Sequence, residues 1–256
     1  MKIDILLVIV GLLGGIINSI AGGGGILMYP TLLAAGLPAI IANATSSLVI
    51  WPGALTSAYG YRKYIKKVPR YYFILLIPAL FGSIIGSLIL VKTSNILFER
   101  IAPWLVVIAV FLLAIQPKIH DHLRKSINKS NSKHPVLVIG VVSILVFPLA
   151  IYGGYFGVGF GIMLLAFLGF TTLTNIHQMN GIKNLTGATI AIVSTLYFAR
   201  AGLIDWHAGL FMLSGNAIGG AIGSHIAQKF NTKIIHRVMV FVGGIVAIVL
   251  LYRAYR

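Results

Sequence analysis

The stretch that decides the fold is Gly82-Ser83-Ile84-Ile85-Gly86-Ser87, because it returns 137 residues later as Gly219-Gly220-Ala221-Ile222-Gly223-Ser224. The same offset places Asn43 on Asn180, each inside a short polar motif that precedes an apolar run. Further identical pairs at this offset include Gly22 and Gly159, Gly24 and Gly161, Leu48 and Leu185, and Ser57 and Ser194. Several motifs that repeat at one constant offset indicate that the chain contains an internal duplication.

The composition indicates a membrane protein. Of the 256 residues, 58% are hydrophobic and only 9% are charged, whereas a soluble domain has about 25% charged residues. Apolar runs such as Tyr71 to Val91 and Ile234 to Tyr252 approach the roughly 20 residues that a helix needs to cross a bilayer. The run from Ile5 has an alternative interpretation as a cleaved signal peptide, with Ser19-Ile20-Ala21 as the cleavage site. The duplication argues against cleavage, because this run has a counterpart in the second half.

The charges of equivalent loops indicate how the two halves are oriented. Residues 62–70 contain five Lys or Arg residues, whereas the equivalent residues 199–207 contain one basic and one acidic residue. Residues 92–100 contain two basic residues and one acidic residue, and the equivalent 228–237 contain three basic residues. Basic loops stay on the cytoplasmic side of a membrane. The two pairs therefore predict halves of opposite orientation, an arrangement typical of secondary transporters.

The predicted fold is all-α, a polytopic membrane protein of two inverted-topology repeats of about five membrane segments each. Residues 1–116 are expected to form the N-terminal transmembrane repeat, 117–134 a basic cytoplasmic linker, and 135–256 the C-terminal transmembrane repeat. In each repeat one segment is a short or broken Gly-rich helix, at 23–36 and 159–172. This prediction gives ten membrane segments, with both chain termini outside the cell. The count is eight or nine if the short segments are counted differently.

A glycine-rich stretch, Asn18 to Gly25, is the first candidate site. Four consecutive glycines disfavour a continuous helix, and unwound backbone at membrane depth occurs only where it is buried or lines a cavity. Free amides at the start of the next helix would bind an anion. The alternative is close packing of helices through small residues. A second copy, Tyr152 to Gly161, favours a site where two broken segments meet.

A second candidate cluster comprises residues 42–47 and its equivalent 179–184. Asn43 and Asn180 are expected either to cap an apolar helix or to bind substrate. Lys183 lies inside an apolar segment, where a charge is costly and usually functional, so it either pairs with an anionic substrate or extends to the membrane interface. The residues predicted to bind substrate are Asn18, Gly23, Gly24, Asn43, Thr45, Ser46, Gly159, Asn180, Lys183 and Asn184. Further polar candidates are His177, Gln178, Asn216 and His225.

The remaining composition limits the chemistry. The chain has no cysteine and only four acidic residues, so a cysteine nucleophile is excluded and a catalytic pair of carboxylates is not expected. We predict no enzyme activity and no cofactor or metal. The net charge of +16 lies mostly in loops, where it meets anionic lipid head groups rather than nucleic acid. The expected partners are a small-molecule anionic substrate and membrane lipids, and the oligomeric state is left open.

Through motifs such as Ala21-Gly22-Gly23-Gly24-Gly25 and Asn180-Gly181-Ile182-Lys183-Asn184, the chain resembles the TauE/SafE sulfite-exporter family of bacterial membrane permeases over essentially its whole length. The second half departs from the family pattern at residues 179–182, where the family more usually has Ala-x-Ala-Thr. The motifs that carry the resemblance are Ala21-Gly22-Gly23-Gly24-Gly25-Ile26-Leu27-Met28-Tyr29-Pro30, Gly36-Leu37-Pro38, Ala42-Asn43-Ala44-Thr45-Ser46, Asn180-Gly181-Ile182-Lys183-Asn184, Gly202-Leu203-Ile204-Asp205-Trp206 and Gly219-Gly220-Ala221-Ile222-Gly223.

The resemblance implies transport of small sulfur-containing anions, such as sulfite, thiosulfate, sulfoacetate or other sulfonates, by a multi-pass protein of the bacterial inner (plasma) membrane. The expected function is a secondary transporter that works by alternating access, with its site at the interface of the two repeats. The alternatives are an anion channel with the same pore and a non-transporting membrane protein. The direction of transport and the coupling ion are left open.

Overall fold

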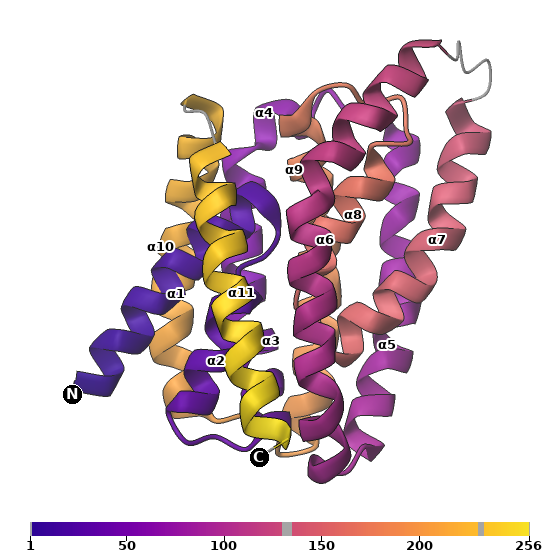
Figure 1. Ribbon diagram of the computed structural model, residues 1–256. Helices are drawn as coiled ribbons and strands as arrows, with labels where there is room; N and C mark the ends of the chain where they lie inside the picture. Colours follow the sequence, from indigo (N-terminus) through magenta and orange to yellow (C-terminus); the bar gives the residue numbers. More distant parts are fainter. Residues whose placement is uncertain (1, 130–134, 230–232, 256) are drawn as a thin grey trace.

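The computed structural model describes residues 2–129, 135–229 and 233–255, and all regular structure in these ranges is helical. The predicted all-α fold is therefore confirmed for the described residues (Figure 1). The elements in chain order are α1 (Lys2–Ala21), α2 (Gly25–Ala34), α3 (Ala39–Gly60), α4 (Arg62–Ile65), the 3-10 helix η1 (Arg70–Leu75), α5 (Leu76–Lys92), α6 (Asn95–Lys129), α7 (Pro135–Tyr155), α8 (Phe160–Leu168), α9 (Ile176–Arg200), α10 (Trp206–Lys229) and α11 (Lys233–Tyr255).

Length and hydropathy identify the segments able to cross a bilayer. Within the described ranges, five helical segments qualify, and their bounds are Lys2–Ala21, Ala39–Gly60, Arg70–Lys92, Asn95–Ile115 and Leu137–Tyr155. The Gly-rich segments expected at 23–36 and 159–172 are the short helices α2 and α8. The expected linker overlaps the end of α6, which continues to Lys129, and residues 130–134 lie outside the described part of the chain.

Glycines with left-handed backbone conformations end α1 and precede α8. Gly22 has a φ of 84° and Gly159, its equivalent in the second half, has a φ of 83°. Only glycine adopts this conformation without steric cost. A Cβ added at Gly22 would also lie 2.6 Å from the Cα atom of Gly161. The break after α1 and the start of α8 are therefore in direct backbone contact.

The helices of the two halves exchange partners. Although α5 belongs to the first half, it packs against α7 and α9, and α10 of the second half packs against α1 and α3. The repeated motif at 82–87 and 219–224 forms these contacts. A Cβ at Gly86 would overlap the carbonyl oxygen of Ile151, and one at Gly219 would overlap that of Leu12. These glycines allow two helix backbones to approach closely, as is common between membrane helices.

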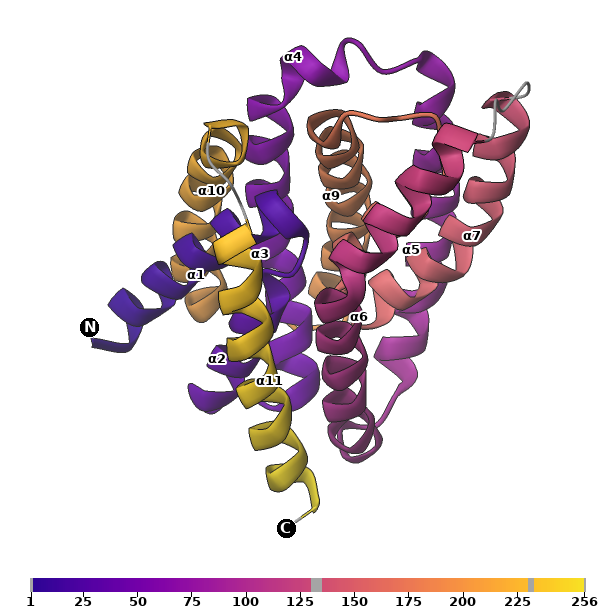
Figure 2. The same ribbon diagram turned by 45° about the horizontal axis from the view of Figure 1, so that its top comes forward.

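Two groups of five helices result from this exchange. Figures 1 and 2 show α1, α2, α3, α10 and α11 on one side and α5, α6, α7, α8 and α9 on the other. Contacts between α3 and α9 and between α6 and α11 join the two groups. Large apolar side chains such as Ile3, Phe81, Phe111 and Phe241 remain exposed on the outside. An apolar exterior of this kind is suited to lipid rather than to water.

Candidate substrate site between the glycine-rich breaks

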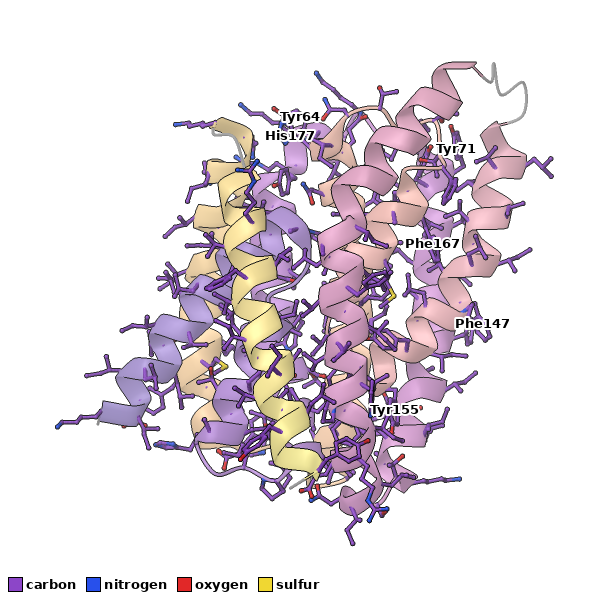
Figure 3. All side chains as sticks on the ribbon, in the orientation of Figure 1. Tyr64, Tyr71, Phe147, Tyr155, Phe167 and His177 are labelled. Carbon is purple, nitrogen blue, oxygen red and sulfur yellow. The ribbon has the colours of Figure 1, made fainter. Side chains whose placement is uncertain are left out.

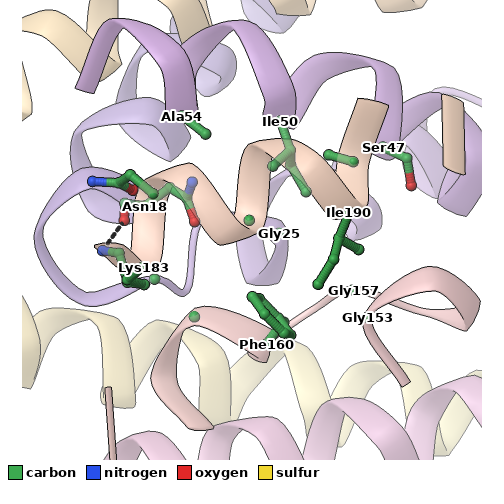
Figure 4. A pocket seen from close by; sticks show the side chains of 15 residues that line it. Asn18, Gly25, Ser47, Ile50, Ala54, Gly153, Gly157, Phe160, Lys183 and Ile190 are labelled. Carbon is green, nitrogen blue, oxygen red and sulfur yellow. Dashed lines mark hydrogen bonds between the residues drawn. The ribbon is translucent and has the colours of Figure 1, made fainter. Parts of the chain in front are cut away.

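A cavity lies where the two Gly-rich breaks meet α3 and α9 (Figure 4). Its empty volume is about 520 Å³, which includes the space at its open side. The cavity is lined by Asn18, Gly22, Gly25, Ser47, Ile50, Ala54, Gly153, Gly157, Phe160, Gly161, Lys183, Asn184, Gly187, Ile190 and Ala191. It is therefore mostly apolar, with Asn18 and Lys183 at the α1 break and Ser47 on α3 among its few polar side chains.

Lys183 is the cationic group that lines the cavity. Its side chain is only 2% exposed, and Nζ donates to the carbonyl oxygens of Asn18 at 2.7 Å and Ser19 at 3.0 Å. These carbonyls are at the end of α1, where a helix favours positive charge. No carboxylate forms an ion pair with Lys183 among the residues whose side chains are described. An ammonium group has three donors, so one N–H remains for a ligand in the cavity.

Asn184, beside Lys183, is held by hydroxyl groups. Its Nδ2 donates to Ser57 Oγ at 2.7 Å, and Ser57 Oγ lies 2.6 Å from Ser19 Oγ. The Oδ1 atom of Asn184 is buried and has no hydrogen-bond partner within the described part of the protein. An unpaired buried amide oxygen costs about 1–3 kcal/mol, so it is expected to bind water or a ligand N–H or O–H group.

Both short helices begin at the cavity. Gly25 is the first residue of α2 and Gly161 is the second residue of α8, and both line it. The first N–H groups of a helix have no acceptor within that helix and carry partial positive charge. Two helix N-termini and one lysine therefore converge on one cavity, an arrangement suited to an anion.

Of the predicted site residues, Asn18, Lys183 and Asn184 line the cavity. Lys183 does not extend to the membrane interface, because its amine is bonded to buried backbone. Asn43 and Asn180 are not helix caps, since the cap positions are Pro38 and Asn175. Asn43 and Asn180 each lie one turn inside the helix, in α3 and α9.

Asn43 joins α3 to the break after α7. Its Nδ2 donates to the carbonyl oxygen of Tyr155 at 2.9 Å, whereas its Oδ1 has no partner among the described residues. Asn180 is 3% exposed, and its Oδ1 likewise has no described partner. The two asparagines thus lie on the helices that border the cavity but not on its wall.

The other predicted residues serve neighbouring contacts. Thr45 Oγ1 accepts a hydrogen bond from the backbone N–H of Asp205 at 3.0 Å, and Ser46 Oγ donates to the Asn43 carbonyl oxygen at 2.7 Å. Gly23, Gly24 and Gly159 lie in the breaks, where their neighbours Gly22, Gly25, Gly157 and Gly161 line the cavity instead.

Most of the apolar wall was not predicted from the sequence. The 137-residue offset contained the signal for it, because three pairs of lining residues are equivalent under this offset. These pairs are Ser47 and Asn184, Ile50 and Gly187, and Ala54 and Ala191.

Comparison with known proteins shows the family of the chain. The model of the family described as "Sulfite exporter TauE/SafE" matches residues 7–250. The chain belongs to the TauE/SafE family. This is a transporter family, so the expectation that the chain is not an enzyme is confirmed.

Relatives cover nearly the full length of the chain. A protein of Haemophilus influenzae named "Probable membrane transporter protein" is 30% identical over 98% of this chain and 96% of its own length. The "Probable membrane transporter protein YfcA" of Escherichia coli is 28% identical over 96% of this chain and 88% of its own. The "Probable membrane transporter protein YunE" of Bacillus subtilis is 26% identical over 97% of both chains. No solved structure matches the chain significantly.

Proposed function

We propose that this TauE/SafE protein is a secondary transporter of small anions, and that its substrates contain sulfur, as in sulfite, thiosulfate, sulfoacetate or other sulfonates. The observation that carries the proposal is the convergence of Lys183 with the first residues of α2 and α8 at one cavity. A lysine with a free N–H donor and without a carboxylate partner among the described side chains favours an anion over a cation or a neutral solute. The family description and the names of the relatives support transport.

The mechanism that we propose is alternating access between two inverted repeats, residues 1–116 and 135–256, joined by 117–134. Support comes from the directions of equivalent helices. In Figure 1, α3 runs toward the end of the molecule that carries α4, whereas α9 starts at that end and runs away from it. The contacts repeat in the same way, since α1 with α10 is equivalent to α7 with α5.

Relative movement of the two five-helix groups would expose the cavity to each side in turn. The site lies between the groups, with walls from α1, α2 and α3 on one side and from α7, α8 and α9 on the other. This is the usual place for a substrate in transporters with inverted repeats. A rocking movement of the two groups changes access to such a site while the helix packing within each group stays the same.

The proposed location is the bacterial inner (plasma) membrane, with the face that carries α4 toward the cytoplasm. Arg62, Lys63, Lys66, Lys67 and Arg70 lie in α4, at the start of η1 and in the segment between them. A concentration of basic residues of this kind stays on the cytoplasmic side. The same residues meet anionic lipid head groups there.

Flux through proteoliposomes tests the proposal. Purified full-length protein is reconstituted, and uptake of labelled sulfite, thiosulfate, sulfoacetate and sulfate is measured with and without the same unlabelled anion inside. We expect saturable uptake that is accelerated by the internal anion for at least one sulfur anion. Linear uptake without acceleration would instead identify a channel, and no flux of any anion through correctly folded protein would contradict both functions.

A further inference from the structure

A row of polar side chains on α3 and α9 leads from the cavity toward the face that carries α4. It begins at Asn184, which donates to Ser57. One helical turn further along α3 is Tyr61, and a Cβ placed on Gly181 of α9 would lie 3.6 Å from the Tyr61 Cβ atom. The Tyr61 ring is stacked at 22° on the ring of His177, with 6.1 Å between centroids. The two helices thus remain adjacent, with polar groups between them, over more than one turn.

The row ends at the surface in a cluster of aromatic rings. The His177 ring lies 4.8 Å from that of Tyr64, and both side chains are half-buried. Figure 3 shows Tyr64 and His177 together at the end of the molecule that carries α4. The rings of Tyr61, Tyr64 and His177 therefore close the row on that side.

Several atoms along this row are buried without hydrogen-bond partners in the described structure. They are the hydroxyl oxygen of Tyr61, Nδ1 of His177 and Oδ1 of Asn184. Tyr61 and Asn184 are 0% and 1% exposed. Buried polar atoms are almost always paired in folded proteins, so unpaired atoms require an explanation such as a bound water or ligand. Several such atoms along one row indicate that water molecules or polar ligands occupy it.

The equivalent row at the other end of the cavity is polar beside the cavity, where Ser194 and Ser47 correspond to Ser57 and Asn184, and apolar further out. Under the 137-residue offset, Tyr61 corresponds to Phe198, His177 to Ile40 and Ser19 to Phe156. These apolar side chains are 0%, 7% and 2% exposed. Phe156 also packs in an edge-to-face contact on Tyr29, with 5.3 Å between ring centroids. The two ends of the cavity therefore differ in polarity at the positions of Tyr61, His177 and Ser19.

We propose that small hydrated anions enter and leave the cavity from the face that carries α4 along this row, with Tyr61 and His177 forming both its gate and an additional anion-binding position. The proposal rests on the proposed transport function, because it concerns the route to the same cavity. The Tyr61 hydroxyl replaces part of the hydration of the passing anion, and the stacked rings close the route when no anion is present. The Phe198 side is sealed by apolar packing in this conformation.

Cysteine accessibility tests the route, and the chain has no cysteine of its own that would react. Ala191→Cys places one thiol on the cavity wall. The probe is the anionic reagent sulfonatoethyl methanethiosulfonate, applied to vesicles of either orientation made from cells that express the full-length variant. We expect faster modification when the reagent is applied from the face that carries α4. Faster modification from the opposite face would overturn the proposal.

Second substitutions test the two named residues. Adding His177→Ala should accelerate modification from the α4 face because it removes a ring of the gate. Adding Tyr61→Phe should slow it by about 2- to 10-fold, the loss expected for one hydrogen bond to the passing anion. Ile40→Ala, at the position equivalent to His177, is the matched control and should leave the rate from the α4 face unchanged. Rates that are the same for His177→Ala, Tyr61→Phe and the parent would refute the gate.

Thiol modification of Ala191→Cys and anion transport by the parent protein are measured separately, so that the route and the proposed function can fail independently. Each variant is first shown to elute as the parent does in gel filtration, and its thiol to react fully in detergent. If Ala191→Cys is modified from the α4 face as expected but the parent protein transports no sulfur anion, the route stands and the proposed function fails. If transport occurs and the cavity thiol is reached only from the other face, the route fails alone.

Discussion

Replacement of Gly22 by alanine should destabilise the protein far more than the same change at Gly36. Both glycines have positive φ, 84° and 95°, so alanine costs about 1–2 kcal/mol at either position for the left-handed backbone. In both variants, alanine also lowers the entropy of the unfolded chain, which offsets about 0.4–1 kcal/mol of this cost. The two substitutions differ in their surroundings. At Gly36 a Cβ meets nothing within 4 Å, whereas at Gly22 it lies 2.6 Å from the Cα of Gly161 and 2.9 Å from the N of Ile162.

Backbone atoms of α8 cannot rotate away from the added methyl group, so Gly22→Ala also carries an overpacking cost of about 1–3 kcal/mol. A difference of this size corresponds to a thermal midpoint roughly 2–12 °C below that of Gly36→Ala. The assay is thermal unfolding of both purified variants in the same detergent, followed by tryptophan fluorescence. Equal midpoints, with anion flux intact in Gly22→Ala, would show that the α1 break and α8 are not in contact.

Three further substitutions test the site and the helix contacts. Lys183→Met should weaken anion binding by about 10- to 150-fold, the loss of one charged hydrogen bond of about 1.5–3 kcal/mol. Lys66→Met, at an exposed position, is the control and should leave anion affinity unchanged. Equal affinities of Lys183→Met and the parent protein in a titration monitored by thermal shift would contradict this role of Lys183. Ser57→Ala should lower the thermal midpoint, because it leaves Asn184 Nδ2 and Ser19 Oγ unpaired at about 1–3 kcal/mol each, and an unchanged midpoint contradicts it. Gly86→Leu should prevent folding, as judged by gel filtration, because the side chain would overlap the α7 backbone; Gly140→Leu, with nothing within 4 Å, should elute normally.

Much of the fold could be predicted from the sequence because membrane helices are encoded by long apolar runs. The short helices were predicted from the glycines, since a left-handed break such as that at Gly22 requires one. The exchange of α5 and α10 was not predicted. Gly86 and Gly219 indicate that some helix approaches closely, but the sequence does not specify which one. Because the lipid around a membrane helix is as apolar as a neighbouring helix, the hydrophobic pattern does not indicate which helices pack together.

The site was predicted in part, and the reasons differ from residue to residue. Lys183 was found because a charge inside an apolar segment is rarely accidental. Its protein partners were not predictable, because they are backbone carbonyl oxygens at the end of α1 rather than side chains. The interpretation of Asn43 as a cap was wrong because α3 begins earlier, at Ala39, after the extended residue Pro38. Asn175 is the true cap of α9, and its side chain accepts from the N–H of His177.

The exchange of α5 and α10 also determines the order in which the chain can be completed during synthesis. When the ribosome has released α5, the helices that it packs against, α7 and α9, have not yet been made. The small-residue face of α5 must therefore wait in lipid or in the insertion machinery until the second half arrives. Neither half can finish its own packing, so the two are obliged to mature together, and a chain truncated after α6 is expected to be recognised as incomplete and degraded.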